Sequence, residues 1–179
     1  MAEAFSNKLA RAAGIVTTSA AGSIGINTNL VTGISTVGVA VSDLVVNANY
    51  ISGTRVTAIG ANSTIVDRDS TNSSAASAQS VKYLGVTTVY TSPASTKSIL
   101  IGGTFANNTN SQVELTVEVY DATEGVGIAI ASKIPVPAGS SFVISDTGKT
   151  VLETADELRV YCDTENALDV SVSILTGVS

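Results

Sequence analysis

The stretch VELTVEVYD, residues 113–121, alternates apolar and polar side chains along its length. Successive side chains of a β-strand point to opposite faces, so this alternation predicts a strand with one buried and one exposed face. VSVSI at residues 170–174 repeats the pattern, and from Lys82 onward about eight such runs are separated by turn residues. Eight short strands at this spacing predict a β-sandwich, jelly-roll-like in arrangement, over residues 82–179.

The composition supports the same class for the whole chain. Hydrophobic residues make up 44% of the 179 residues but aromatic residues only 4%, so the apolar content is mostly Val, Ile, Ala and Leu. Short β-branched runs between Gly, Ser, Thr and Asn are typical of all-β proteins. A disordered Ser/Thr-rich chain would carry more charge than the 13% found here.

The N-terminal residues 2–13 are the one segment with a helical pattern. Phe5, Leu9 and Ala12 fall at i, i+4 and i+7, and Gly14 follows as a helix stop. A helix this short is marginal in water, so we expect it to dock on a neighbouring chain. The predicted docking residues are Phe5, Leu9, Lys8 and Arg11.

Three parts of the chain follow from these patterns: a docking helix at 1–14, a small β module at 15–81, and the sandwich at 82–179. The module consists of short apolar runs with turns, and the Ser/Thr/Asn-rich residues 69–80 are its expected linker. Charge divides unevenly, since residues 1–81 sum to zero and residues 82–179 sum to −6. Two modules with different surfaces are expected.

Several function classes are disfavoured by composition. A net charge of −6 argues against nucleic-acid binding, which needs cations to neutralise phosphates. No run reaches the roughly 18 apolar residues that cross a bilayer, and no apolar leader is visible, so neither a membrane partner nor standard export is expected. The chain has no His and a single Cys, Cys162, in the strand-like run ELRVYCD, where a buried structural role is expected. No enzyme, cofactor or metal site is predicted.

Three short motifs resemble chemical sites. Asp146-Thr147-Gly148 is the aspartic-protease tripeptide, but one copy followed by Lys149 fits a hairpin turn better. Gly148-Lys149-Thr150 ends like a phosphate loop, yet Val143 stands where its first Gly is required. The carboxylates of Asp67 and Asp69 lack the distal Glu of a calcium loop, and a solvated loop is expected there.

The opening AEAFSNKLARAAG resembles the start of small virion structural proteins of tailed phages of the marine, cyanophage type. Strands similar to that family's sandwich follow at residues 89–109, 135–144, 149–160 and 169–177. The intervening residues 37–74 resemble a recurrent β module of phage structural proteins, best at Gly53-Thr54 and residues 55–60. The resemblance implies a β-sandwich virion protein with such a module inserted after its N-terminal segment.

The function that this resemblance implies is structural and non-enzymatic. The first expectation is a capsid decoration or cement protein in the virion, made in the host cytoplasm and bound to the major capsid protein. A neck, tail or baseplate component is the alternative, and a receptor- or glycan-binding module is a second one. The exposed sandwich positions carry Ser and Thr rather than Lys or Pro, so open sheet edges are expected to pair into a homo-trimer or another closed ring.

Overall fold

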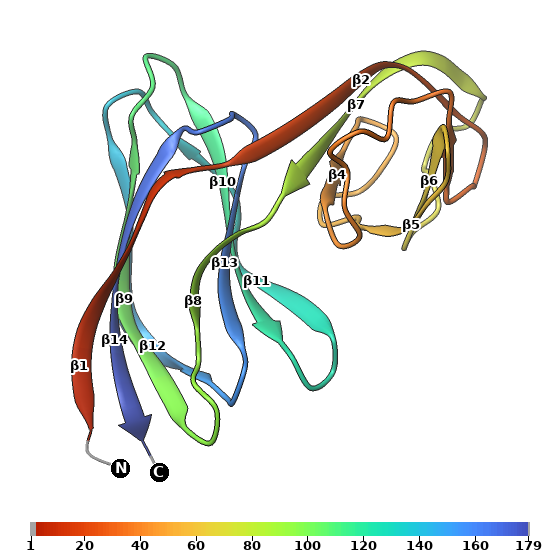
Figure 1. The fold of residues 1–179 in the computed structure, drawn as a ribbon. Coiled ribbons are helices and arrows are strands. Elements are labelled where there is room, and N and C mark those ends of the chain that lie inside the picture. The colour runs from red at the N-terminus through yellow and green to blue at the C-terminus, as the bar shows by residue number, and fades with distance from the viewer. Residues whose placement is uncertain (1–2, 179) are drawn as a thin grey trace. The chain divides into compact units, whose positions relative to one another are not determined.

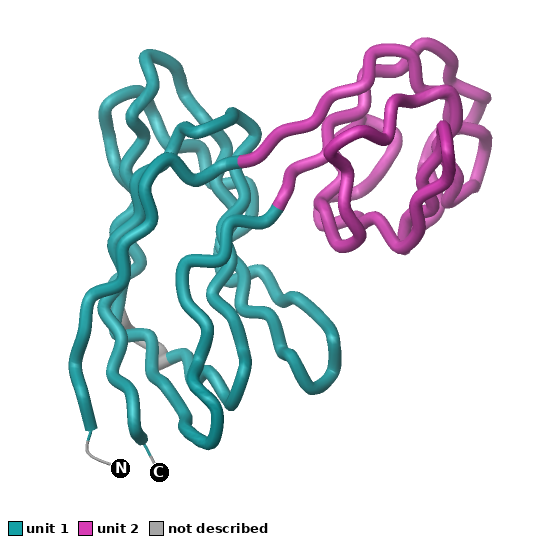
Figure 2. Tube along the Cα trace, viewed as in Figure 1, with its two compact units in different colours: residues 1–14, 86–179 teal, residues 15–85 magenta. Residues whose placement is uncertain are grey.

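The computed structural model describes residues 3–178, except for the side chains of residues 146–149. Within this part of the chain the structure has fourteen β-strands and no helix. The chain divides into two compact units, which Figure 2 distinguishes by colour. Unit 1 contains residues 1–14 and 86–179, and unit 2 contains residues 15–85. Among the described residues, no helix has the length and apolar content to span a membrane.

Unit 1 is a sandwich of two four-stranded antiparallel sheets. Sheet I has the order β1-β14-β9-β12, and sheet II has the order β11-β10-β13-β8. The strands are β1 (Ala4–Ala13), β8 (Thr87–Thr91), β9 (Lys97–Asn107), β10 (Val113–Asp121), β11 (Val126–Val136), β12 (Ser141–Leu152), β13 (Glu157–Cys162) and β14 (Leu168–Val178).

The strand order of unit 1 is that of a jelly roll. Counted along the chain within this unit, sheet I holds its first, eighth, third and sixth strands, and sheet II holds the fifth, fourth, seventh and second. Strands that are neighbours in sequence therefore mostly lie in opposite sheets, as the wrapped Greek keys of a jelly roll require. The predicted all-β sandwich is confirmed, but residues 82–179 supply only seven of its strands, and β1, from the segment predicted to be a helix, supplies the remaining one.

Alternation fills the space between the two sheets with apolar side chains. Sheet I contributes residues such as Phe105 and Ile174, and sheet II contributes Leu115, Leu158 and Cys162, all of them inaccessible to solvent. The Phe105 and Phe142 rings lie 6.2 Å apart between centroids, which adds an aromatic contact. The run that predicted a strand, residues 113–121, places Val113, Leu115 and Val117 in this core as its alternation requires.

The predicted N-terminal helix is wrong, because residues 4–13 form strand β1. Phe5 pairs with Leu175 and Leu9 with Ser171 along an antiparallel ladder with β14 (Figure 1). An isolated helix of this length would have to be stabilised by a partner chain. The ladder instead satisfies the backbone from within the protein, using a strand at the other end of the sequence. The helical spacing of Phe5, Leu9 and Ala12 is only a local preference, and pairing with β14 stabilises the segment as a strand instead.

The sequence predicts a hairpin turn at residues 146–149, which carry the Asp-Thr-Gly motif and most of the Gly-Lys-Thr motif. The side chains of these four residues lie outside the described part of the structure. The flanking segments are defined, and both pair with β9: Ser145 lies opposite Gly102, and Thr150 lies opposite Leu100. The two flanks therefore continue one strand, β12, with an irregularity between them. They are not the two arms of a hairpin, because each already has β9 as its partner.

Unit 2 is a small six-stranded sheet with the order β4-β7-β2-β3-β6-β5. Hydrogen bonds from Val45 N–H to Thr54 C=O and from Val56 N–H to Asp43 C=O join its two ends, so the sheet closes into a barrel. Its core includes Val31 and Tyr83. The strands are β2 (Ile15–Ile24), β3 (Leu30–Thr32), β4 (Leu44–Val46), β5 (Val56–Ile59), β6 (Ser63–Val66) and β7 (Ala76–Gly85).

Unit 2 is inserted into the connection between β1 and β8. The chain enters through Ile15 and leaves through Gly85, and these two residues pair with each other. Gly14, at the entry, has φ +120°, and a Cβ atom there would lie 2.5 Å from the Thr164 carbonyl oxygen, so this position requires glycine. The units meet at residues 85 and 86, so the Ser-rich residues 69–80 lie within unit 2.

Candidate interaction surface

Strand β1 separates the four predicted docking residues onto two faces. Phe5 and Leu9 point away from the core and are 65% and 75% exposed, and Arg11 continues that alternation. Lys8 lies on the inner face, with its ammonium nitrogen 5.8 Å from the centre of the Tyr90 ring. This distance is within the range of a cation–π contact. Phe5, Leu9 and Arg11 are thus together, and Lys8 is not.

An apolar row crosses the outer face of sheet I, the face that points away from the core. Phe5 of β1 pairs with Leu175 of β14, Leu175 pairs with Ile99 of β9, and Ile99 pairs with Val151 of β12. Residues opposite one another on antiparallel strands have neighbouring side chains on the same face. We call Phe5, Leu175, Ile99 and Val151 the Phe5 row; Phe5 and Val151 are exposed, and the central two are half-buried.

Two further rows on this face are uncharged. One is polar, and in it the Ser173 hydroxyl donates to Asn7 Oδ1 at 3.0 Å. The other has an apolar residue at each end, Leu9 and Val143, with small polar residues between them. The polar row consists of Asn7, Ser173, Gly102 and Ser145, and the mixed row consists of Leu9, Ser171, Thr104 and Val143.

Charges on the outer face of sheet I lie at its two ends. At one end the Lys97 ammonium contacts the Glu153 carboxylate at 2.8 Å. At the other end the Ala12 N–H donates to Asp169 Oδ1, and this hydrogen bond, with the nearby Arg11, holds the pKa of Asp169 below its usual value. A charge-depleted centre within a charged rim is typical of protein interfaces. Among the described side chains, the outer face of sheet I has this layout.

The four sheet edges of the sandwich are better protected than the sequence suggested. On β1, Lys8 points inward and the ladder shifts register after Ala10; on β11, Pro135 lacks an N–H and the ladder shifts twice. The pairing of β12 is interrupted after Ser145, and β8 has only five residues. Inward charges, bulges, prolines and short strands all oppose pairing between edges. These features make edge-to-edge pairing less favourable than the sequence suggested, and the homo-trimer or closed ring remains a prediction.

The outer face of sheet II carries a buried charged cluster. Arg159 Nε contacts Glu157 Oε2 at 2.8 Å, and its guanidinium lies 3.4 Å from the centre of the Tyr120 ring. Tyr161 donates to Glu118 Oε1, and the Glu118 side chain lies so close to Gly127 that a Cβ there would be 2.2 Å from Oε1. The Arg159 guanidinium thus contacts two carboxylates, those of Glu157 and Glu118, so each charge of the cluster has a partner, as buried charges must. The cluster is structural.

The described residues give little support for a reactive or metal-binding site. Cys162 lies in the core, and burial raises the pKa of its thiol to about 11, which keeps it protonated and unreactive near neutral pH. No group of three or more metal-binding side chains occurs in the described part of the chain. Asp67 is used structurally, because its Oδ1 accepts the Arg55 N–H at 2.8 Å.

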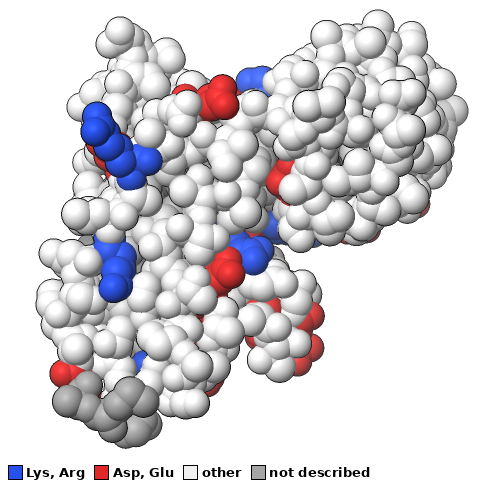
Figure 3. Space-filling model, in the orientation of Figure 1, with Lys and Arg blue, Asp and Glu red and all other residues white. Residues whose placement is uncertain are grey.

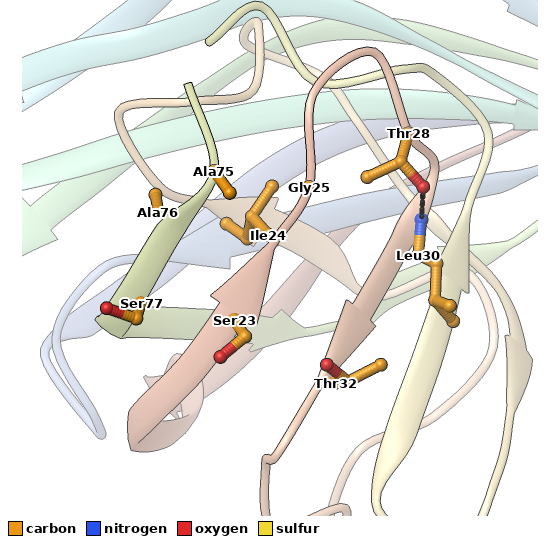
Figure 4. A pocket seen from close by; sticks show the side chains of 9 residues that line it. All are labelled: Ser23, Ile24, Gly25, Thr28, Leu30, Thr32, Ala75, Ala76 and Ser77. Carbon is orange, nitrogen blue, oxygen red and sulfur yellow. Dashed lines mark hydrogen bonds between the residues drawn. The ribbon is translucent and has the colours of Figure 1, made fainter. Parts of the chain in front are cut away.

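One depression of about 420 Å³ lies on unit 2, beside the ends of β2, β3 and β7 (Figure 4). Apart from Ile24 and Leu30, the residues that line it are small, and the Thr28 hydroxyl accepts the Leu30 N–H within it. They are Ser23, Ile24, Gly25, Thr28, Leu30, Thr32, Ala75, Ala76 and Ser77. With no charged or aromatic side chain in this set, the depression offers neither a charged ligand nor a sugar ring a strong contact.

No family model, curated protein or solved structure matches this chain. The candidate surface therefore depends on geometry alone. Sequence reasoning found Phe5 and Leu9 but missed Leu175, Ile99 and Val151, whose strands were predicted without their register. Alternation could have placed each residue on an outer face, but only pairing shows that they form one row.

Proposed function

We propose that this chain is a non-enzymatic structural protein of a tailed-phage virion, and specifically a head decoration protein. Its resemblance to small virion proteins, noted above at the N-terminus and from Val89 onward, supports the virion assignment. Three rows without charged residues on the outer face of sheet I and the absence of a metal-binding cluster among the described residues favour an assembly role over catalysis.

The observation that carries the decoration role is the difference in surface charge between the units. Unit 1 has 12 acidic and 6 basic residues, a net charge of −6, whereas unit 2 has 3 of each and is neutral. Unit 2 also exposes aliphatic side chains on its loops, and Val37 is 83% exposed. Figure 3 shows large uncharged areas with only scattered charged side chains. Neutral, apolar surface suits contact with a capsid, and acidic surface suits contact with solvent.

Under this proposal, unit 2 contacts the major capsid protein and unit 1 faces water. Net negative charge on unit 1 would keep decorated particles apart, because like charges repel. The contact itself should depend only weakly on salt, since unit 2 has few charges to be screened. A neck or tail position would use the same surfaces on a different partner and differs in copy number.

Quantitative mass spectrometry of particles purified from the encoding phage tests the proposal. A copy number close to that of the major capsid protein supports decoration, whereas a small number matching a ring symmetry moves the protein to the neck or tail. Absence from purified particles overturns the virion role. Val37→Asp in unit 2 should reduce occupancy, and Ile128→Asp in unit 1, at a position 62% exposed, is the matched control that should not.

A further inference from the structure

The Phe5 row is nearly symmetric about the middle of sheet I. Its two half-buried residues, Leu175 and Ile99, lie on the central strands β14 and β9, and its two exposed residues lie on the edge strands. The mixed row repeats this symmetry, with Leu9 and Val143 at its ends and small polar residues in the centre. A surface with this symmetry is complementary to itself.

We propose that the outer face of sheet I binds the same face of a second copy of this chain, about a two-fold axis parallel to the strands and between β14 and β9. Such an axis brings β1 against the partner's β12 and β14 against the partner's β9. Phe5 then meets the partner's Val151, and Leu175 meets the partner's Ile99. The inference does not depend on the proposed virion function.

The other two-fold arrangement, with its axis perpendicular to the strands, fits less well. When that axis passes through the polar row, at the centre of the three rows, it exchanges the Phe5 row with the mixed row, so Leu175 would meet the partner's Ser171 and Ile99 would meet the partner's Thr104. Apolar side chains would then be buried against hydroxyl groups, which lose water without gaining a hydrogen bond. An axis parallel to the strands instead places apolar on apolar and polar on polar, and isologous contacts of this kind close at two subunits.

Charge and edges favour a second copy as the occupant. The net charge of unit 1 is −6, and self-association would be opposed if acidic groups lay in the contact. The described charges on the outer face of sheet I lie at its ends, where Lys97 is already paired with Glu153. The guarded edges direct association to a face, and two sheet faces pack about 10 Å apart when both are apolar.

The size of the contact sets its strength. Four strands about 4.8 Å apart and five residues at about 3.4 Å give a patch of roughly 300 to 400 Å² on each copy. This is about half of the roughly 800 Å² per partner that stable complexes bury. The dimer should therefore be weak in dilute solution and concentration-dependent. Copies held close together on a larger assembly would form it far more completely, because tethering raises the effective concentration.

Site-specific crosslinking of the full chain tests the arrangement. Ser173 of β14 lies on the outer face of sheet I near the proposed axis, so Ser173→Cys should form a covalent dimer with a short bis-maleimide. The native Cys162 is buried and should not react. Ser132→Cys, at an exposed position on β11, is the matched control and should stay monomeric. Equal crosslinking at both positions, or none at Ser173→Cys, overturns the proposal.

Sedimentation velocity across a concentration series provides a second measure that needs no crosslink. The unmodified protein should show a monomer–dimer equilibrium, and Phe5→Ser should weaken it by at least about tenfold because it removes an aromatic anchor. Val37→Ser, which removes an even more exposed apolar residue on unit 2, should leave the equilibrium unchanged. A protein that remains monomeric at every concentration, or equal effects of the two substitutions, would contradict the inference.

Discussion

The two units of this protein solve the same problem, the protection of sheet edges, in different ways. Unit 1 is an open sandwich whose four edges are guarded by Lys8, bulges and Pro135. Unit 2 closes its sheet through the hydrogen bonds between β4 and the start of β5, so its main ladder has no free end there. An open sandwich keeps two broad faces available for association, whereas a small closed barrel presents mainly loops.

The cores of the two units also differ, in size and in polarity. Unit 1 has strands of up to twelve residues and an extended apolar core built from both sheets. Unit 2 has four strands of three or four residues and relies on buried hydrogen bonds, such as Thr64 to Tyr83 at 3.0 Å and Ser70 to the Gly25 carbonyl at 2.9 Å. Short strands bury fewer side chains, so polar contacts carry more of the stability of unit 2.

The largest expected effect is on the core of unit 1. Phe105→Ala should lower the free energy of unfolding of unit 1 by about 3 to 5 kcal/mol, because it leaves a cavity where the ring contacts Phe142. Hydrogen exchange resolved by peptide should show the loss within residues 86–179 and none within residues 15–85. Equal loss of protection in both units would show that they unfold together and would break the comparison.

Alkaline pH should affect the two units at different points. Burial raises the pKa of Cys162 in unit 1 from 9.0 to about 11, and of Tyr50 in unit 2 from 10.0 to about 12. Each raised pKa means that the folded state holds the proton longer than the unfolded state, so stability is complete at lower pH and falls as pH rises. The fall should begin near pH 9 in unit 1 and near pH 10 in unit 2.

The size of each alkaline effect, once pH has passed both values, is about 2 to 3 kcal/mol. Urea titrations at a series of pH values, read by hydrogen exchange in each unit, provide the measurement. Cys162→Ala should remove the earlier onset in unit 1 without changing unit 2. If unit 1 keeps its onset near pH 9 in that variant, another group causes it.

Removing one hydrogen bond from the polar core of unit 2 should have a smaller effect on stability. Tyr83→Phe leaves the fully buried Thr64 hydroxyl without its partner and should cost unit 2 about 1 to 3 kcal/mol. Adding Thr64→Val should restore part of that loss, because an apolar pair has no unmet hydrogen bond. Thermal unfolding of both variants is the check, and full stability of Tyr83→Phe alone would show that this hydrogen bond contributes little.

The smallest expected effect is that of removing unit 2. Gly14 N–H donates to the Thr87 hydroxyl at 3.2 Å, so residues 15–85 can be deleted with a short connection between β1 and β8. Unit 1 should keep its fold, and its stability should change by less than about 1 kcal/mol, because loop-closure entropy varies slowly with length. Loss of the jelly-roll fold, seen as collapsed amide dispersion by NMR, would show that the sandwich depends on the barrel.

Local patterns in the sequence were sufficient for the class of the fold and for many of its strands. Alternation in residues 113–121 placed Val113, Leu115 and Val117 in the core, and the structure confirms each of them. The alternation did not predict burial of the opposite face, where Thr116 and Glu118 are buried as well, because a local pattern does not show what packs over the polar side of a strand. The uneven distribution of charge between the two parts of the chain could also be predicted, because it follows from counting charged residues in the sequence.

Tertiary structure decided the rest, because pairing is not a local property. Phe5 and Leu9 have helical spacing and also lie on one face of a strand, and only the presence of β14 selects the strand. The Phe5 row joins residues from both ends and the middle of the chain, and a shift of one residue in any register would send its members into the core. The candidate surface therefore exists only in the folded protein, where antiparallel pairing aligns Phe5, Leu175, Ile99 and Val151.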